Sequence, residues 1–164
     1  VVTIVNPLML GAQNFIGPRI MHAYADGGAS SLRRIVSTSS AGYAGILLMF
    51  SAGMLIAGDA LVAFTYGAKY SGNGALVALL SLNLACNGLG FAFSRGLFAL
   101  EQASIDFKVN FVALAAMITC GLLLAKSYGP AGAAIGQLTA NGAATLVRAG
   151  AFYACARKHG ARRP

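Results

Sequence analysis

The charged residues of this chain are separated by five long runs that contain no charge at all. The runs cover residues 1–18, 35–58, 70–94, 109–125 and 127–147. A helix needs about 20 consecutive, mainly apolar residues to cross the hydrocarbon core of a bilayer. Each run is close to that length, so the spacing of the charges predicts a protein that crosses a membrane several times.

The composition favours the same class of protein. The chain of 164 residues is 57% hydrophobic and only 10% charged, and its mean hydropathy is +0.70. A soluble domain carries about 25% charged residues, and a small one leaves much of its surface in water. The runs are continuous rather than alternately apolar and polar, which favours helices over a barrel.

We therefore expect an all-α integral membrane protein, a bundle of about five transmembrane helices in contact with the lipid bilayer. The predicted spans are residues 2–21, 35–57, 73–99, 109–125 and 130–154. Gly132 and Gly136 have the G-x-x-x-G spacing that lets two helices approach closely. Packing is the expected role of this pair.

The basic residues predict the orientation of these spans. The net charge is +8, but the lysines and arginines fall between the apolar runs rather than on one soluble face, so we expect no nucleic-acid partner. Ten of the twelve map to one side: Arg19, Arg33, Arg34, Arg95, Lys108, Arg148, Arg157, Lys158, Arg162 and Arg163. The positive-inside rule then predicts a cytoplasmic C-terminus.

The start of the chain does not resemble the start of a complete membrane protein. The first residue is Val1, and no basic segment precedes the first apolar run. An external N-terminus on an odd number of spans is also unusual. We expect a C-terminal piece of a larger protein, with a helical bundle over residues 1–156 and a basic cytoplasmic tail over residues 157–164.

Polar side chains form a stripe on two of the predicted helices. At about 100° per residue, the stripe of the third span occupies roughly 40° and that of the fifth roughly 80°. The first stripe contains Asn83, Asn87 and Ser94, and the second contains Gln137, Asn141, Thr145 and Arg148. Such stripes either line a hydrated cavity or form hydrogen bonds between helices.

The residues of common catalytic and metal sites are sparse and badly placed. The four acids are Asp26, Asp59, Glu101 and Asp106, and all are expected near span ends or in loops. The two histidines also lie near span ends, and no phosphate-binding loop or complete G-x-G-x-x-G is present. We expect no enzymatic activity, no cofactor and no metal.

Three segments resemble a known family. These are "LVAFTYGAKYSGNGALVALLSL" (residues 61–82), "SYGPAGAAIGQLTANG" (residues 127–142) and "YADGGASSLRRIVSTSS" (residues 24–40). They are similar to an interfacial Tyr-Gly-x-x-Tyr stretch, a Tyr-Gly-x-x-Gly-Ala-Ala turn and an arginine-containing loop of the oligosaccharide and polysaccharide flippases. These flippases, of the O-antigen type, belong to the multidrug/oligosaccharidyl-lipid/polysaccharide exporter superfamily.

The resemblance implies a fold and a function. The family fold has two similar helical lobes around a central cavity, and this chain would form most of the C-terminal lobe, with the N-terminal lobe of the same protein as its partner. The implied substrate is a polyprenyl-diphosphate-linked oligosaccharide, moved across the cytoplasmic (inner) membrane for lipopolysaccharide or exopolysaccharide biosynthesis. In this setting the polar stripes would meet the sugar, because amide side chains offer hydrogen-bond donors and acceptors to hydroxyl groups.

The arginines at the cytoplasmic ends of the spans have two interpretations. Arg95 and Arg148, with Arg19 or Arg33, could receive the lipid diphosphate, since guanidinium groups suit phosphate oxygens. Alternatively, they reach lipid phosphates as anchors. Two other functions stay open: a multidrug exporter of the same superfamily, although no expected span carries a coupling carboxylate, and a non-transporting scaffold of a glycan-assembly complex.

Overall fold

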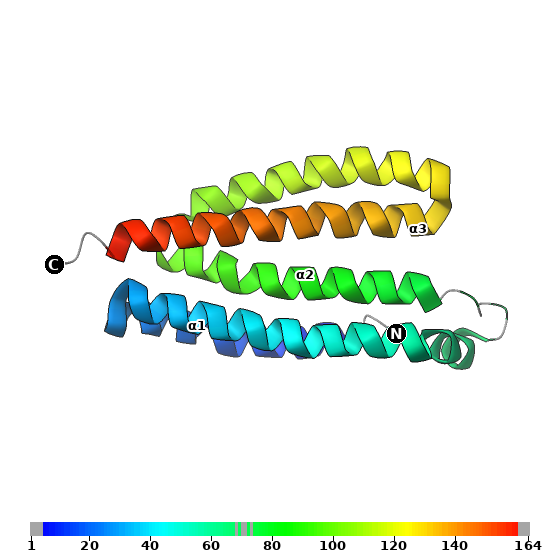
Figure 1. The fold of residues 1–164 in the computed structure, drawn as a ribbon, viewed down its shortest axis with the longest axis horizontal. Coiled ribbons are helices and arrows are strands. Elements are labelled where there is room, and N and C mark those ends of the chain that lie inside the picture. The colour runs from blue at the N-terminus through cyan, green and yellow to red at the C-terminus, as the bar shows by residue number, and fades with distance from the viewer. Residues whose placement is uncertain (1–4, 68, 70–71, 73, 161–164) are drawn as a thin grey trace.

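The chain folds into long helices. The computed structural model describes residues 5–67, 69, 72 and 74–160. Its helices are α1 (Val5–Tyr66), α2 (Gly74–Ala99) and α3 (Ala103–Gly160), and no strand occurs among the residues described (Figure 1). All three are long and apolar enough to cross a membrane. The protein is therefore all-α, with the length and composition of a membrane-embedded chain.

α1 and α3 each reverse direction at a single glycine. The backbone leaves the helical conformation at Gly28 (φ 64°, ψ −156°) and at Gly129 (φ 62°, ψ −143°), and each glycine joins two helices. This region of φ and ψ is nearly closed to residues with a Cβ atom. α1 thus includes the described part of the first predicted span (residues 5–21) and the whole second span, and α3 includes the last two. Residues 2–4 of the first span lie outside the described part of the chain, and five separate membrane crossings stay a prediction.

The helical segments are longer than expected because the predicted loops are themselves largely helical. The segment between the first two predicted spans, residues 22–34, is helical except at Gly28, and α3 continues to Gly160, into the predicted tail. Residues 161–164, including Arg162 and Arg163, lie outside the described part of the chain. Pro130 directly follows Gly129, at the start of a helical arm, where a missing N–H costs little.

A carboxylate stabilises the start of α2. The Asp59 Oδ1 atom accepts hydrogen bonds from the backbone N–H groups of Gly72 (2.9 Å) and Gly74 (2.7 Å). The first N–H groups of a helix have no partner within the helix and favour a negative charge. Asp59, expected only as a charge near a span end, therefore ties the last part of α1 to the beginning of α2.

α2 ends in a Schellman motif. The N–H of Gln102 donates to the Leu97 carbonyl oxygen (2.9 Å), and that of Glu101 donates to Phe98 (3.0 Å). Glu101 has a φ of 59°, in the left-handed region where glycine usually stands in this motif. The three-residue connection, residues 100–102, brings α3 back against α2.

The main core lies where all three helices meet. Ile20, Leu32 and Val36 of α1 pack there with Leu97 of α2 and Phe152 of α3. Gly96 permits this contact, because a Cβ atom at that position would approach the Phe152 ring to 2.6 Å. The core therefore joins the two arms of α1 to each other and to both other helices.

The core lies toward one end of the bundle. That end contains the Gly28 reversal, the α2–α3 connection and the C-terminal end of α3, whereas the α1–α2 connection and the Gly129 reversal lie at the other (Figure 1). We call the first the basic end, because Arg33, Arg34, Arg157 and Lys158 are near it in the chain. The side of the membrane that it faces stays a prediction.

The outer surface is strongly apolar. Ile56, Met49 and Leu146 are 89%, 78% and 75% exposed, and Phe64 is also open. Soluble monomers rarely present so many large apolar side chains without a partner. Such a surface is compatible with contact with lipid.

Candidate functional site

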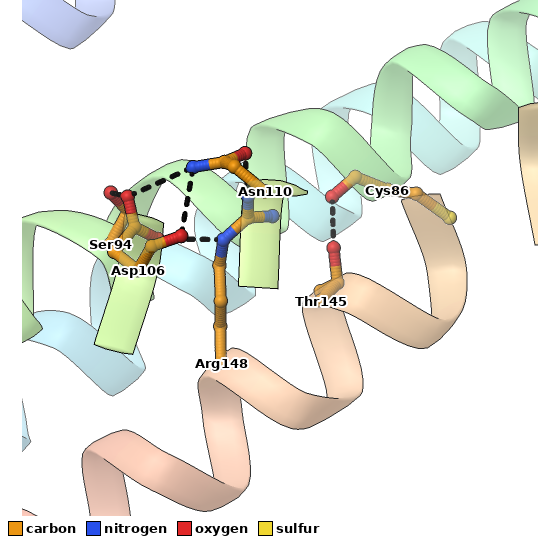
Figure 2. A network of polar contacts seen from close by, with 6 residues as sticks. All are labelled: Cys86, Ser94, Asp106, Asn110, Thr145 and Arg148. Atoms are coloured by element: carbon orange, nitrogen blue, oxygen red, sulfur yellow. Dashed lines mark hydrogen bonds and ion pairs between the residues drawn. The ribbon is translucent and has the colours of Figure 1, made fainter. Parts of the chain in front are cut away.

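A buried ion pair joins the two arms of α3. The Nε atom of Arg148 lies 2.8 Å from Oδ1 of Asp106, and the side chains are only 12% and 9% exposed (Figure 2). Asp106 is in the first turn of α3, and Arg148 is 42 residues further along the chain. The pair therefore fixes how the two arms lie against each other.

Further hydrogen bonds satisfy both members of the pair. The Ser94 hydroxyl of α2 donates to the Asp106 Oδ2 atom (2.9 Å), and the Asn110 amide lies 3.3 Å from the same oxygen. The Nη2 atom of Arg148 donates to Asn110 Oδ1 (2.5 Å). Burying a charge is costly unless it is paired and hydrogen-bonded, and these four side chains meet that requirement (Figure 2). We call them the Asp106 network.

A glycine makes room for this network on α2. A Cβ atom at Gly90 would lie 3.0 Å from Nη1 of Arg148 and 2.9 Å from Oγ1 of Thr145. Thr145 uses its hydroxyl to donate to the backbone oxygen of Cys86 (2.9 Å) (Figure 2). Gly90 thus lets two polar side chains of α3 lie directly on the backbone of α2.

One amide from each of the two predicted stripes takes part in a hydrogen bond between α2 and α3. Asn141 of α3 donates to the Asn83 side-chain oxygen of α2 (2.7 Å), and Asn83 is buried. Asn87 donates to the backbone oxygen of Asn83 within α2 (3.1 Å) and is exposed. Of the two alternatives for the stripes, bonding across helices is the one present for Asn83 and Asn141. A role in a hydrated cavity stays a prediction.

Arg95 does not share a site with Arg148. Arg95 is exposed, and its guanidinium carbon lies 4.9 Å from the centroid of the Phe91 ring and 5.9 Å from that of Phe98. Arg95 also lines a hollow of about 320 Å³ with Gln13 and Asn14, on the first arm of α1. Ser94 and Arg95 are adjacent in sequence but face different neighbours.

The remaining predicted residues have simpler surroundings. Gln137 is half-buried on α3. Arg19 lies over the ring of Phe15, 3.9 Å from its centroid, and is exposed. Neither is part of the Asp106 network.

Sequence reasoning missed Asp106 and Asn110. It placed Asp106 in a connection before a span beginning at Val109, whereas α3 begins at Ala103 and Asp106 is buried. Two features of the sequence could have indicated them. Asp106 and Asn110 are four residues apart and therefore lie on one helix face, and Arg148 within a predicted span needs a residue of opposite charge. No group of three or more histidine, cysteine or acidic residues that could hold a metal occurs among the described residues.

Comparison of the chain with protein-family models, curated proteins and solved structures gives no match in any of the three.

Proposed function

We propose that the chain forms part of a membrane transporter, a flippase that moves a polyprenyl-diphosphate-linked oligosaccharide across the cytoplasmic membrane for cell-surface polysaccharide biosynthesis. The observation that carries this proposal is the buried Asp106–Arg148 pair in a bundle whose outer surface is apolar. Ionisable groups within membrane helices are costly and commonly mark substrate or ion pathways. A scaffold can be apolar throughout, so the polar network favours a transporter.

The proposed diphosphate contact is Arg95. It lacks an ion-pair partner among the described residues, and its hollow also offers the amides of Gln13 and Asn14. A guanidinium group suits phosphate oxygens, and amides suit sugar hydroxyl groups. Arg148 is less available for phosphate because Asp106 already neutralises it. The resemblance of residues 61–82 and 127–142 to the flippases supports the same substrate class.

The test is transport by the complete transporter, reconstituted in vesicles with a fluorescent polyprenyl-diphosphate oligosaccharide. An impermeant quencher reports the fraction of substrate in the outer leaflet. Arg95→Gln is expected to slow transport about tenfold or more, because phosphate loses a charged hydrogen-bond donor. Arg19→Gln, which removes an exposed arginine stacked on Phe15, is the matched control.

Unchanged transport by Arg95→Gln at normal protein levels would contradict the diphosphate contact. Equal transport with and without the protein would contradict the function as a flippase and favour the scaffold.

A multidrug exporter is the second candidate, and one observation favours it. Such exporters commonly use membrane carboxylates for ion coupling, and Asp106 is a buried carboxylate on a helix. Asp106→Asn in vesicles loaded with a cationic dye separates the candidates: loss of dye efflux with no effect of Arg95→Gln on the lipid-linked sugar supports the exporter.

A further inference from the structure

A second polar hollow lies at the basic end, between the second arm of α1 and the last part of α3. It measures about 300 Å³ and is lined by Ser30, Arg33, Arg34, Ser37 and Tyr153. It contains two guanidinium groups and three hydroxyl groups and no carboxylate. From the sequence alone, Arg33 and Arg34 have no expected role beyond anchoring or an auxiliary contact, so this grouping is a product of the fold.

The hydroxyl groups of this hollow are positioned across two helices. The Oγ atom of Ser37 lies 2.8 Å from the Tyr153 hydroxyl, in hydrogen-bond distance. The guanidinium carbon of Arg33 lies 6.0 Å from the centroid of the Tyr153 ring. Tyr153 in turn packs edge-on against Phe93 and Phe152. The main core thereby holds one wall of the hollow in place.

The electrostatics of the hollow favour an anion. Neither Arg33 nor Arg34 forms an ion pair within the part of the chain that the structure describes. The second arm of α1 begins just after Gly28, so its first N–H groups, near Ser30, add positive potential. Arginine and hydroxyl groups at a helix start are the usual donors to phosphate oxygens.

The surroundings favour a lipid as the source of that anion. Arg34 also lines a neighbouring hollow of about 270 Å³ with Ser31, Ile35 and Thr38. The two hollows therefore share Arg34 on the same arm of α1, and the second is the less polar of the two. A phosphate with an attached apolar chain fits this sequence of surfaces better than a small soluble anion.

We propose that the hollow formed by Ser30, Arg33, Arg34, Ser37 and Tyr153 binds the phosphate group of an anionic membrane lipid. Basic recesses between membrane helices bind anionic headgroups in this way. The site is separate from the Arg95 hollow, which faces the first arm of α1. The inference therefore does not depend on the transported substrate.

The test is retention of phosphatidylglycerol by the purified complete protein, titrated in detergent and measured by native mass spectrometry. Arg33→Gln with Arg34→Gln is expected to weaken retention about tenfold or more. Arg157→Gln with Lys158→Gln removes the same charge from an adjacent basic pair near the same end and is expected to leave retention within about twofold, because that pair does not line the hollow.

Two milder variants keep the test independent of folding. Tyr153→Phe retains the ring and Ser37→Ala removes only a hydroxyl, and each is expected to weaken retention about threefold. Arg95→Gln is expected to have no effect, which separates this site from the proposed substrate site.

Two results would overturn the proposal. An equal loss of lipid retention in the variant Arg157→Gln with Lys158→Gln would show that only the net charge of the protein matters. Displacement of the lipid by millimolar inorganic phosphate, with phosphate bound at the same stoichiometry, would show that the ligand is a soluble anion and not a lipid.

Discussion

Asp106 and Arg148 depend on each other because each is buried. Arg148→Gln leaves the Asp106 carboxylate in an apolar bundle with only Ser94 and Asn110 as partners. Removing one member of a buried pair costs about 3–5 kcal/mol of the free energy of unfolding. We expect Arg148→Gln to lower stability by that order, measured by unfolding in mixed micelles.

The double variant Asp106→Asn with Arg148→Gln is the control for this prediction. It removes both charges and keeps hydrogen-bonding groups, so its loss of stability is expected to be smaller than that of Arg148→Gln alone. A double variant that is less stable than either single one would contradict the pairing.

The hydrogen bond between the side chains of Asn83 and Asn141 provides a second prediction. Asn141→Ala removes the bond to the Asn83 side chain, and such bonds in membrane bundles contribute about 0.6 kcal/mol on average and at most about 1.7. Asn87→Ala is the matched control, because Asn87 is exposed and bonds only within α2. Equal losses in the same unfolding measurement would show that the Asn83–Asn141 bond contributes nothing specific.

The left-handed backbone conformation of Glu101 predicts that a substitution at this position stabilises the protein. A residue with a Cβ atom in the left-handed region costs about 1–2 kcal/mol, and glycine is the usual residue here in a Schellman motif. Since glycine also has more freedom in the unfolded chain, we expect Glu101→Gly to raise stability by up to about 1 kcal/mol. Gln102→Gly, one position further on, lacks a positive φ and is expected to bring no gain.

The polar contacts of α2 and α3 differ in how far the sequence predicts them. Helical periodicity placed Asn83 and Asn141 on polar stripes, and the structure joins their side chains by a hydrogen bond. Periodicity could place Asp106 and Asn110 on one helix face but not join them to Arg148, because that contact depends on where α3 begins and on the return of its second arm 42 residues later. The length of an uncharged run indicates how much apolar surface a segment has, but it does not predict the residue at which a helix begins.

The helical hairpins of α1 and α3 rest on glycine in two ways. Gly28 and Gly129 provide the backbone conformation for the reversals, and Gly136 allows close approach of the arms of α3. A Cβ atom at Gly136 would lie 2.7 Å from the Cα atom of Gly121, which is backbone and cannot rotate away. The packing role predicted for the G-x-x-x-G spacing is confirmed at Gly136.

Gly136→Ala is therefore expected to separate the arms of α3 and to destabilise the protein by about 1–3 kcal/mol, the usual cost of overpacking. Gly142→Ala on the same arm is the control, because no atom lies within 4 Å of its added Cβ. A Gly142→Ala variant as unstable as Gly136→Ala in the unfolding measurement would show that the loss does not come from this contact.

The connection between the first two predicted spans differs in form from what its composition favours. The segment "ADGGASS" (residues 25–31) has the composition of a loop of several residues, whereas only Gly28 leaves the helical conformation. The flanking residues remain helical because their apolar side chains, Ile20 and Leu32 among them, pack in the main core. Tertiary packing thus extends a helix into a segment whose composition favours a turn.

The arrangement of the complete bundle predicts two-sided accessibility. The Gly28 reversal and the α2–α3 connection lie at one end, and the Gly129 reversal lies at the other. In a variant without native cysteines, single cysteines at Ser30 and Gln102 are expected to react with an impermeant maleimide from one side of the membrane. A cysteine at Ser127 is expected to react from the opposite side.

Labelling of all three positions from one side would show that the reversals do not lie on opposite membrane faces. The basic composition near Ser30 predicts that this position faces the cytoplasm.

The separation of Asp106 and Arg148 along the chain also has a consequence for biosynthesis. Ribosomes add about 5–20 residues per second, so the 42 residues between the two charges take about 2–8 s to synthesise. During that interval Asp106 has emerged but its counter-charge has not. An unpaired carboxylate is costly in hydrocarbon, so we expect the first arm of α3 to reach its final depth only after the second arm arrives. The prediction is that the two arms insert together, as one hairpin.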